Sequence, residues 1–124
     1  MKKYYIPTLV MIVLFTSSCV QPTRNINITL KLHLKGMKDV QRVGVKGNDK
    51  PLSWDQGLPM TPIIKDSLYT VTYTLKTGYN FTEIKFTVDD KTELKGQPNR
   101  RLEFPNTNRV VYEAAFDNPG TKAK

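Results

Sequence analysis

Few side chains in this sequence could carry out bond-breaking chemistry. The chain has one histidine, His33, and one cysteine, Cys19. A Ser/His/Asp or Cys/His arrangement needs a nucleophile beside a well-placed histidine, and the usual zinc sites need several cysteines or histidines. His33 falls on the polar side of an alternating segment, which places it on a solvent-facing surface away from any pocket. We therefore expect no enzyme activity and neither a metal nor a cofactor, and binding is the favoured class of function.

Two adjacent carboxylates, Asp89 and Asp90, form the most conspicuous acidic pair. Such a pair could contribute to a calcium site or to acid–base chemistry. Adjacent aspartates between two apolar segments are more typical of a tight turn, because their short side chains hydrogen-bond the nearby backbone. We expect these two residues to form a turn.

Cys19 lies directly behind a short apolar N-terminal segment. Residues 2–3 are lysines, residues 6–15 form an apolar stretch of about ten residues, and residues 16–18 are the small residues that a signal peptidase needs. A membrane-spanning helix needs roughly 20 apolar residues, about twice this length. The pattern predicts a cleaved signal peptide over residues 1–18.

The small residues before Cys19 resemble the lipobox of bacterial lipoproteins, with Thr16 at a position where that motif usually has leucine. The resemblance implies that Cys19 becomes the lipidated first residue of the mature protein. It also implies a domain outside the cytoplasm, anchored to a membrane of the bacterial cell envelope, the outer membrane being the expected one. The alternative is an ordinary secretory signal followed by an unpaired cysteine.

The length and charge of the mature chain restrict its architecture and partners. Without residues 1–18 the chain has 106 residues, which is enough for one domain. The formal net charge falls from +8 to +6, because the signal contains two of the 19 basic residues and none of the 11 acidic ones. These basic residues are scattered along the sequence, so no nucleic-acid partner is expected. A solvated basic surface is the favoured explanation, and the alternative is weak attraction to anionic lipid headgroups or cell-wall polymers.

The mature chain divides into three parts. Residues 19–25 are polar and are expected to form a tether, residues 26–117 contain the alternating segments of one β-sandwich, and residues 118–124 are expected to form a C-terminal tail.

Alternating apolar and polar residues predict a series of β-strands. In the first, Ile26 to Leu34, every second residue is apolar, as in a half-buried strand. Further strands are expected at residues 43–46, 69–75, 84–88, 102–104 and 110–116, with a short segment near 93–94. Apolar residues at helical spacing do not persist over any segment. The prediction is an all-β fold, an antiparallel immunoglobulin-like β-sandwich of about seven strands.

The order of four motifs between Val43 and Phe104 resembles the starch-binding modules of carbohydrate-binding module family 20 and the related glycogen-binding family 48. The motifs are Pro51–Asp55 (PLSWD), Gly57–Met60 (GLPM), Glu83–Phe86 (EIKF) and Pro98–Arg101 (PNRR). The resemblance covers about half of the mature chain, and the first and last strands agree in position. It implies a sandwich that binds a polysaccharide, an α-glucan such as starch.

By this resemblance, three residues would contact the sugar. The residue at Trp54 stacks its ring on a glucose face, the residue at Lys85 contacts sugar hydroxyls, and the residue at Asn99 hydrogen-bonds to the sugar. The chemistry of these side chains is suited to sugar binding. An indole provides a rigid apolar plane, and an ammonium and an amide provide hydrogen-bonding groups for hydroxyls. Lys85 also falls on the outward face of its predicted strand.

The sequence departs from the family at its second stacking aromatic, where Leu94 stands, followed by Lys95 in place of a common acid. Losing one of two stacking rings removes on the order of 1 to 3 kcal/mol, by analogy with other rings stacked on aromatics. Either Tyr79 or Phe81 in the neighbouring loop replaces the missing ring, or the scaffold binds a different ligand.

Each matched residue also has a structural explanation. Trp54 could be a core or loop-anchoring residue, Lys85 a solvated strand lysine and Asn99 a turn residue, while Arg100 is expected to pair with a carboxylate. The favoured function is a membrane-anchored carbohydrate-binding lipoprotein without catalytic activity. The alternative is an immunoglobulin-like structural or interaction lipoprotein that has lost sugar binding and docks onto an envelope protein through a strand edge or an aromatic patch.

Overall fold

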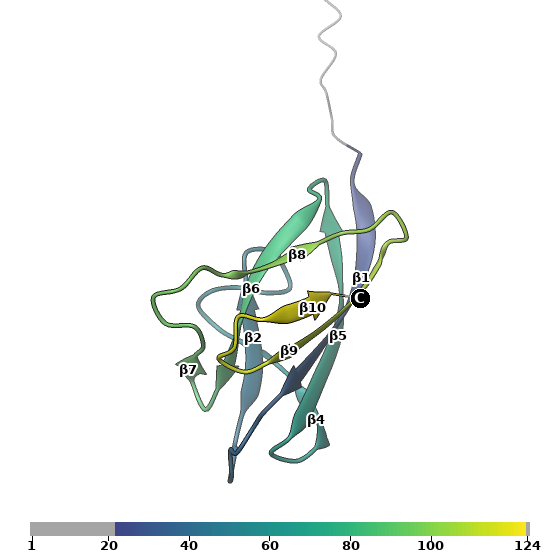
Figure 1. The fold of residues 1–124 in the computed structure, drawn as a ribbon. Helices are drawn as coiled ribbons and strands as arrows, with labels where there is room; N and C mark the ends of the chain where they lie inside the picture. The colour runs from purple at the N-terminus through teal and green to yellow at the C-terminus, as the bar shows by residue number, and fades with distance from the viewer. Residues whose placement is uncertain (1–21, 124) are drawn as a thin grey trace, which may run out of the picture.

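The computed structural model describes residues 22–123, and these fold into ten β-strands arranged in two sheets (Figure 1). Three of the strands have two or three residues, and the other seven have four or more. The predicted all-β sandwich of about seven strands is therefore confirmed. Within residues 22–123 no helix is long and apolar enough to cross a membrane. The signal peptide predicted at residues 1–18 and the lipidation site at Cys19 lie outside the described residues.

The two sheets each contain five strands. The first sheet has the order β10 (Thr121–Ala123), β9 (Arg109–Ala115), β1 (Arg24–His33), β5 (Leu68–Thr77) and β4 (Thr61–Ile64). The second has the order β3 (Leu58–Pro59), β2 (Val43–Gly47), β6 (Phe81–Val88) and β7 (Lys91–Thr92), and β8 (Arg100–Glu103) also pairs with β6.

The core between the sheets follows from the period-2 pattern of the strands. In β1 the residues Ile26, Ile28, Leu30 and Leu32 are fully buried, and the residues between them point outward. The second sheet contributes Phe86 and its inward-facing neighbours in the same way. Burying one such side chain stabilises the fold by roughly 1.5–3 kcal/mol. The outward side chains of the second sheet are thereby held on a rigid support.

The pairing of β1 differs from the prediction. This strand pairs antiparallel with β5 but parallel with β9, so the first sheet is mixed. A parallel neighbour is compatible with the same alternation, because the inward and outward faces of a strand do not depend on the direction of its partner.

Both predicted ends of the sandwich are corrected. The strand β1 begins at Arg24, two residues inside the expected tether 19–25, because Arg24 and Asn25 continue the ladder with β5. The expected tail 118–124 contains β10, which pairs antiparallel with β9. Backbone pairing with an available neighbour does not require apolar residues, and this is why composition did not reveal either segment.

The segment Leu58–Ile64 joins the two sheets at one edge. Its first part pairs with β2, its second part pairs with β5, and Met60 between them is 6% exposed. All four residues of β4 are exposed. The strand therefore forms an open edge of the first sheet, at the end of the molecule opposite the start of β1 (Figure 1).

Asp89 and Asp90 form the predicted turn, and both have positive φ angles, 47° and 67°. The carboxylate of Asp89 accepts hydrogen bonds from the backbone N–H groups of Arg42 (2.9 Å) and Gln41 (2.8 Å). These two hydrogen bonds lower the pKa of Asp89, and the bond from Arg42 makes the largest contribution. The pair thus connects the β6–β7 turn to the chain leading into β2.

Candidate functional site

The candidate site lies on the outer face of the second sheet, which we define as the surface formed by the outward side chains of β2, β6 and β8. In the β2–β6 ladder Lys46 lies opposite Lys85, and in the β6–β8 ladder Glu83 lies opposite Arg101. Since residues two apart on a strand share a face, Glu83 and Lys85 lie next to each other on β6. This face is therefore rich in charged groups.

Trp54 lies at the border of the outer face, in the loop after β2. Its indole is 38% exposed, and Nε1–H donates a 2.6 Å hydrogen bond to Oδ1 of Asn48. Asn48 in turn donates from Nδ2 to Oε2 of Glu83 at 3.3 Å. Trp54 is thus not a core residue: its polar edge is held by the loop while part of its ring remains open to solvent.

Lys85 points outward from β6, as the alternation predicts, and is only partly exposed. Its ammonium donates to the backbone carbonyls of Leu94 (3.0 Å) and Gln97 (2.9 Å). Both carbonyls belong to the loop between β7 and β8, residues 93–99. Because an ammonium has three N–H groups, one donor is left for a ligand. Lys85 therefore stabilises this loop and keeps one ammonium N–H group for a further hydrogen bond.

Asn99 lies directly before β8 and is partly exposed. It lines a cavity of about 200 Å³ together with Leu94, Gln97 and Tyr112. Leu94 and Gln97 are the two residues whose carbonyls hold Lys85. Lys85 and Asn99 are therefore connected through the β7–β8 loop, and Trp54 is connected to the same sheet through Asn48 and Glu83.

Leu94, which the sequence resemblance aligns with the second stacking ring of starch-binding modules, is buried, with 1% of its surface exposed. Its backbone has a φ of 52°, and its N–H donates to Oδ1 of Asp117 at 2.8 Å. Leu94 consequently provides no surface on which a sugar ring could stack.

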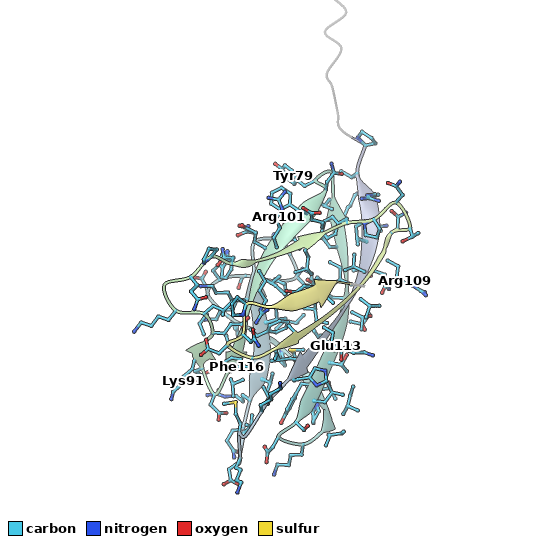
Figure 2. The ribbon with its side chains drawn as sticks, viewed as in Figure 1. Tyr79, Lys91, Arg101, Arg109, Glu113 and Phe116 are labelled. Carbon is cyan, nitrogen blue, oxygen red and sulfur yellow. The ribbon has the colours of Figure 1, made fainter. Side chains whose placement is uncertain are left out.

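The two aromatic residues suggested as replacements lie at one end of the molecule. Tyr79, in the turn between β5 and β6, is 66% exposed. Phe81 is covered by Arg101, whose guanidinium carbon lies 3.7 Å from the ring centroid. Figure 2 shows Tyr79 and Arg101 near this end and Lys91 farther from it, at the side of the molecule. Of these two rings, Tyr79 is the more accessible.

A buried ion pair holds the β7–β8 loop on the side that faces the protein interior. Glu93 and Arg100 are joined by two hydrogen bonds, Nε to Oε2 at 2.6 Å and Nη2 to Oε1 at 2.7 Å, and their side chains are 0% and 2% exposed. Burial by itself lowers the pKa of Arg100, but the hydrogen bond to Glu93 and a smaller contribution from Tyr112 raise it overall. The predicted pairing of Arg100 with a carboxylate is confirmed.

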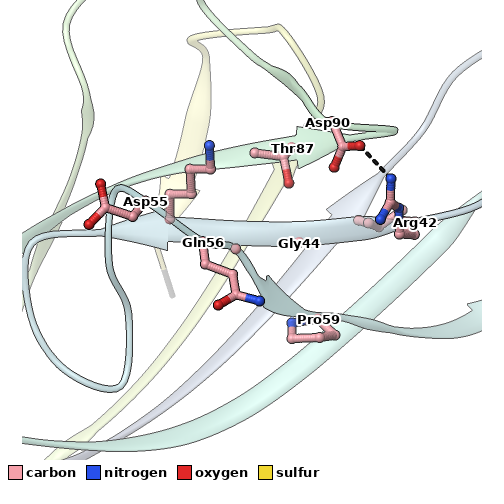
Figure 3. Close-up of a pocket in the computed structure, with 10 residues that line it drawn as sticks. Arg42, Gly44, Asp55, Gln56, Pro59, Thr87 and Asp90 are labelled. Atoms are coloured by element: carbon pink, nitrogen blue, oxygen red, sulfur yellow. Dashed lines mark hydrogen bonds and ion pairs between the residues drawn. The ribbon is translucent and has the colours of Figure 1, made fainter.

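A second cavity on the outer face has a volume of about 420 Å³ and lies between β2 and the loop that contains Trp54 (Figure 3). Figure 3 shows the ion pair of Arg42 with Asp90 at one end and Asp55 at the other. Positive and negative groups are mixed in its lining, so this cavity has no strong preference for the charge of a ligand.

His33 lies at the end of β1, and its Nε2 is 2.5 Å from Oε1 of Glu113 on β9. Among residues 22–123, no three His, Cys, Asp or Glu side chains are grouped so that they could hold a metal ion.

Three contributions to the site were not predicted from the sequence. Asn48 and Glu83 hold Trp54 in place, and Glu93 anchors the β7–β8 loop. Of these, Glu83 could have been identified from the sequence. It lies two residues before Lys85 on the same predicted strand and therefore on the same outward face. The contact between Asn48 and Trp54 depends on the path of a loop that composition does not specify.

Comparison with known proteins gives evidence about the fold. No family model matches the chain, and no curated protein matches it. A solved structure that does match is the Glycoside Hydrolase Family 15 Glucoamylase from Hypocrea jecorina, with a TM-score of 0.55 and 18% sequence identity. The match covers 81% of this chain and 18% of the glucoamylase chain, so this chain spans less than a fifth of that protein's length. At this level of identity the chain is similar to part of the glucoamylase in fold alone.

Proposed function

We propose that this protein binds a carbohydrate polymer, an α-glucan, on the outer face of the second sheet and catalyses no reaction. The observation that carries the proposal is the state of Trp54, which is partly exposed while its Nε1–H is bonded to Asn48. A ring fixed in this way loses little conformational entropy when a sugar stacks on it. Lys85 and Asn99 would supply hydrogen bonds to sugar hydroxyls on either side of the β7–β8 loop.

The resemblance of the Pro51–Asp55, Glu83–Phe86 and Pro98–Arg101 motifs to starch-binding modules supports the same proposal. Trp54, Lys85 and Asn99 all lie on or beside one sheet, which agrees with a shallow surface site. We extend the proposal to the location of the protein: lipidated Cys19 would anchor it in the bacterial cell envelope, at the outer membrane.

Retention on insoluble polysaccharides tests the sugar site. The protein, purified with Cys19→Ser to prevent lipidation, is mixed with starch, cellulose or peptidoglycan, and the Trp54→Ala variant is treated in the same way. We expect retention on starch and at least tenfold weaker binding by Trp54→Ala, since a stacked ring contributes on the order of 1 to 3 kcal/mol. Asn48→Ala should give an intermediate loss, because the ring remains but is no longer held.

Ile64→Ala is the matched control for this experiment, because it removes a 57% exposed apolar side chain from the other sheet. It should bind starch as the unaltered protein does. Undiminished binding by a folded Trp54→Ala variant would rule out the proposed site.

A second candidate function is docking onto a protein of the cell envelope through β4. This strand is an open sheet edge, and it carries Ile63 and Ile64, which are 54% and 57% exposed. An extended segment of a partner could add to such an edge through backbone hydrogen bonds. A defined envelope protein that co-purifies with the unaltered chain but not with Ile64→Lys, together with no retention on starch, would favour this function over sugar binding.

A further inference from the structure

Three lysines that are separate in the sequence line one cavity beside β6, β7 and the β7–β8 loop. The cavity has a volume of about 590 Å³, which is within the range of small-ligand sites. Its lining residues are Lys85, Lys91, Thr92, Glu93, Lys95 and Gly96. The lysines come from β6, from β7 and from the β7–β8 loop, so only the fold brings them together.

The acid in this lining does not compensate the lysines. Both oxygens of Glu93 bond to Arg100, at 2.6 and 2.7 Å, and they also accept the backbone N–H groups of Phe86 (2.9 Å) and Asp117 (3.0 Å). The side chain of Glu93 is fully buried. Because its charge is balanced by a buried guanidinium, the cavity has a local excess of positive charge.

The position of one of these charges is fixed by the structure. Lys85 is held by two backbone carbonyls, while Lys91 and Lys95 are exposed and can adjust to a ligand. Lys46 lies opposite Lys85 in the β2–β6 ladder and adds a fourth positive group on the same face. The neighbouring acid, Glu83, is hydrogen-bonded to Asn48.

We propose that this cavity binds an acidic group carried by the polysaccharide, so that the site prefers an anionic glycan to a neutral one. The inference rests on the proposed function, because Lys85 belongs both to the sugar site and to the cavity. The shared chemistry is a carboxylate, sulfate or phosphate oxygen that accepts hydrogen bonds from ammonium groups. Attraction between exposed charges weakens with added salt, and binding should weaken accordingly.

Dextran and dextran sulfate provide a matched pair of ligands, because they share one glucan backbone and differ in their anionic groups. Binding to both is measured for the Cys19→Ser protein and for its Lys91→Glu/Lys95→Glu variant. We expect tighter binding to dextran sulfate, decreasing with salt, and a loss of roughly tenfold or more in the double variant. Polygalacturonate tests whether a carboxylate is accepted in place of a sulfate.

The control variant is Lys35→Glu/Lys38→Glu, which changes the net charge equally at two exposed lysines before β2. It should keep its affinity for dextran sulfate. Equal losses in the two double variants would mean general attraction by net charge and would overturn the proposal. Binding to vesicles of anionic phospholipid that depends on Lys91 and Lys95, without binding to dextran sulfate, would also overturn it in favour of a lipid headgroup.

The starch-retention assay distinguishes loss of the anionic preference alone from loss of all sugar binding. Retention on starch that depends on Trp54, with no preference for dextran sulfate, would leave the sugar site intact and refute the anionic preference. No retention on starch, dextran, dextran sulfate or polygalacturonate would refute both.

Discussion

At the scale of single residues, the outer face combines side chains with two kinds of role. Trp54 and Asn99 have groups available to a ligand, whereas Glu93 and Arg100 are buried and fix the backbone beneath them. Lys85 belongs to both groups, since its ammonium holds two loop carbonyls and keeps one further donor. The geometry of the candidate site therefore depends on buried residues as well as on exposed ones.

The ion pair of Glu93 with Arg100 provides a test of this support. Glu93→Ala would leave the Arg100 guanidinium buried and unpaired, and we expect it to lower the free energy of unfolding by about 3–5 kcal/mol. Urea denaturation measures this difference. Glu93→Gln, which keeps the size of the side chain, should fall between Glu93→Ala and the unaltered protein.

The exposed ion pair of Arg42 with Asp90 is the matched control, because both side chains are 73% exposed. Surface pairs contribute little, so Arg42→Ala should cost less than about 1 kcal/mol. Similar losses for Glu93→Ala and Arg42→Ala would show that burial does not distinguish the two pairs.

At the scale of elements, six strands could be predicted because short apolar segments, some of them alternating with polar residues as in β1, are separated by turn residues. The structure places β1, β2, β5, β6, β8 and β9 at or near their expected positions. The strands β3, β4, β7 and β10 were not predicted. All four have only two to four residues and lie at sheet ends, and Pro59 and Pro62 interrupt the pattern, so their backbone pairing leaves no periodic signal.

The assignment of Trp54, Lys85 and Asn99 as sugar contacts comes from the sequence resemblance and stays a prediction. The alternation of β6 correctly predicted that Lys85 points outward. The burial of Leu94 could not be foreseen, because it depends on a positive φ angle and on a hydrogen bond to Asp117 from a distant strand end. Contacts between loops are not encoded in local periodicity.

The link between the β6–β7 turn and β2 leads to a prediction about pH. Hydrogen bonds from the backbone N–H groups of Arg42 and Gln41 lower the pKa of Asp89, so the carboxylate is favoured more in the folded than in the unfolded chain. Its contribution to stability is complete above the ordinary aspartate pKa of about 3.9 and is lost as pH falls through the lower folded value.

Asp89→Asn should therefore lower the melting temperature near neutral pH, and the difference from the unaltered protein should shrink in acid. Thermal unfolding followed by circular dichroism from about pH 6 to about pH 3 measures this trend. A difference between the two proteins that does not change with pH would contradict the assignment to Asp89.

At the scale of the whole molecule, the fold concentrates charge that is dispersed in the sequence. The lysines Lys85, Lys91 and Lys95 are spread over two strands and a loop, and the sequence alone favoured a solvated basic surface over attraction to anionic lipids or polymers. Antiparallel pairing of β6 with β7 brings them to one cavity, while the acid between them is buried against Arg100. The local charge of this cavity is thus a property of the topology more than of the net charge of the chain.

The parallel pairing of β1 with β9 has a consequence for the kinetics of folding. His33 on β1 and Glu113 on β9 are 80 residues apart in the chain, so the central strand of the first sheet obtains its second neighbour only after most of the chain has been synthesised. Closing so long a loop is entropically costly, and folds dominated by such contacts take on the order of milliseconds to seconds to form. A nascent chain of this protein would therefore stay incompletely folded until its last long strand has emerged.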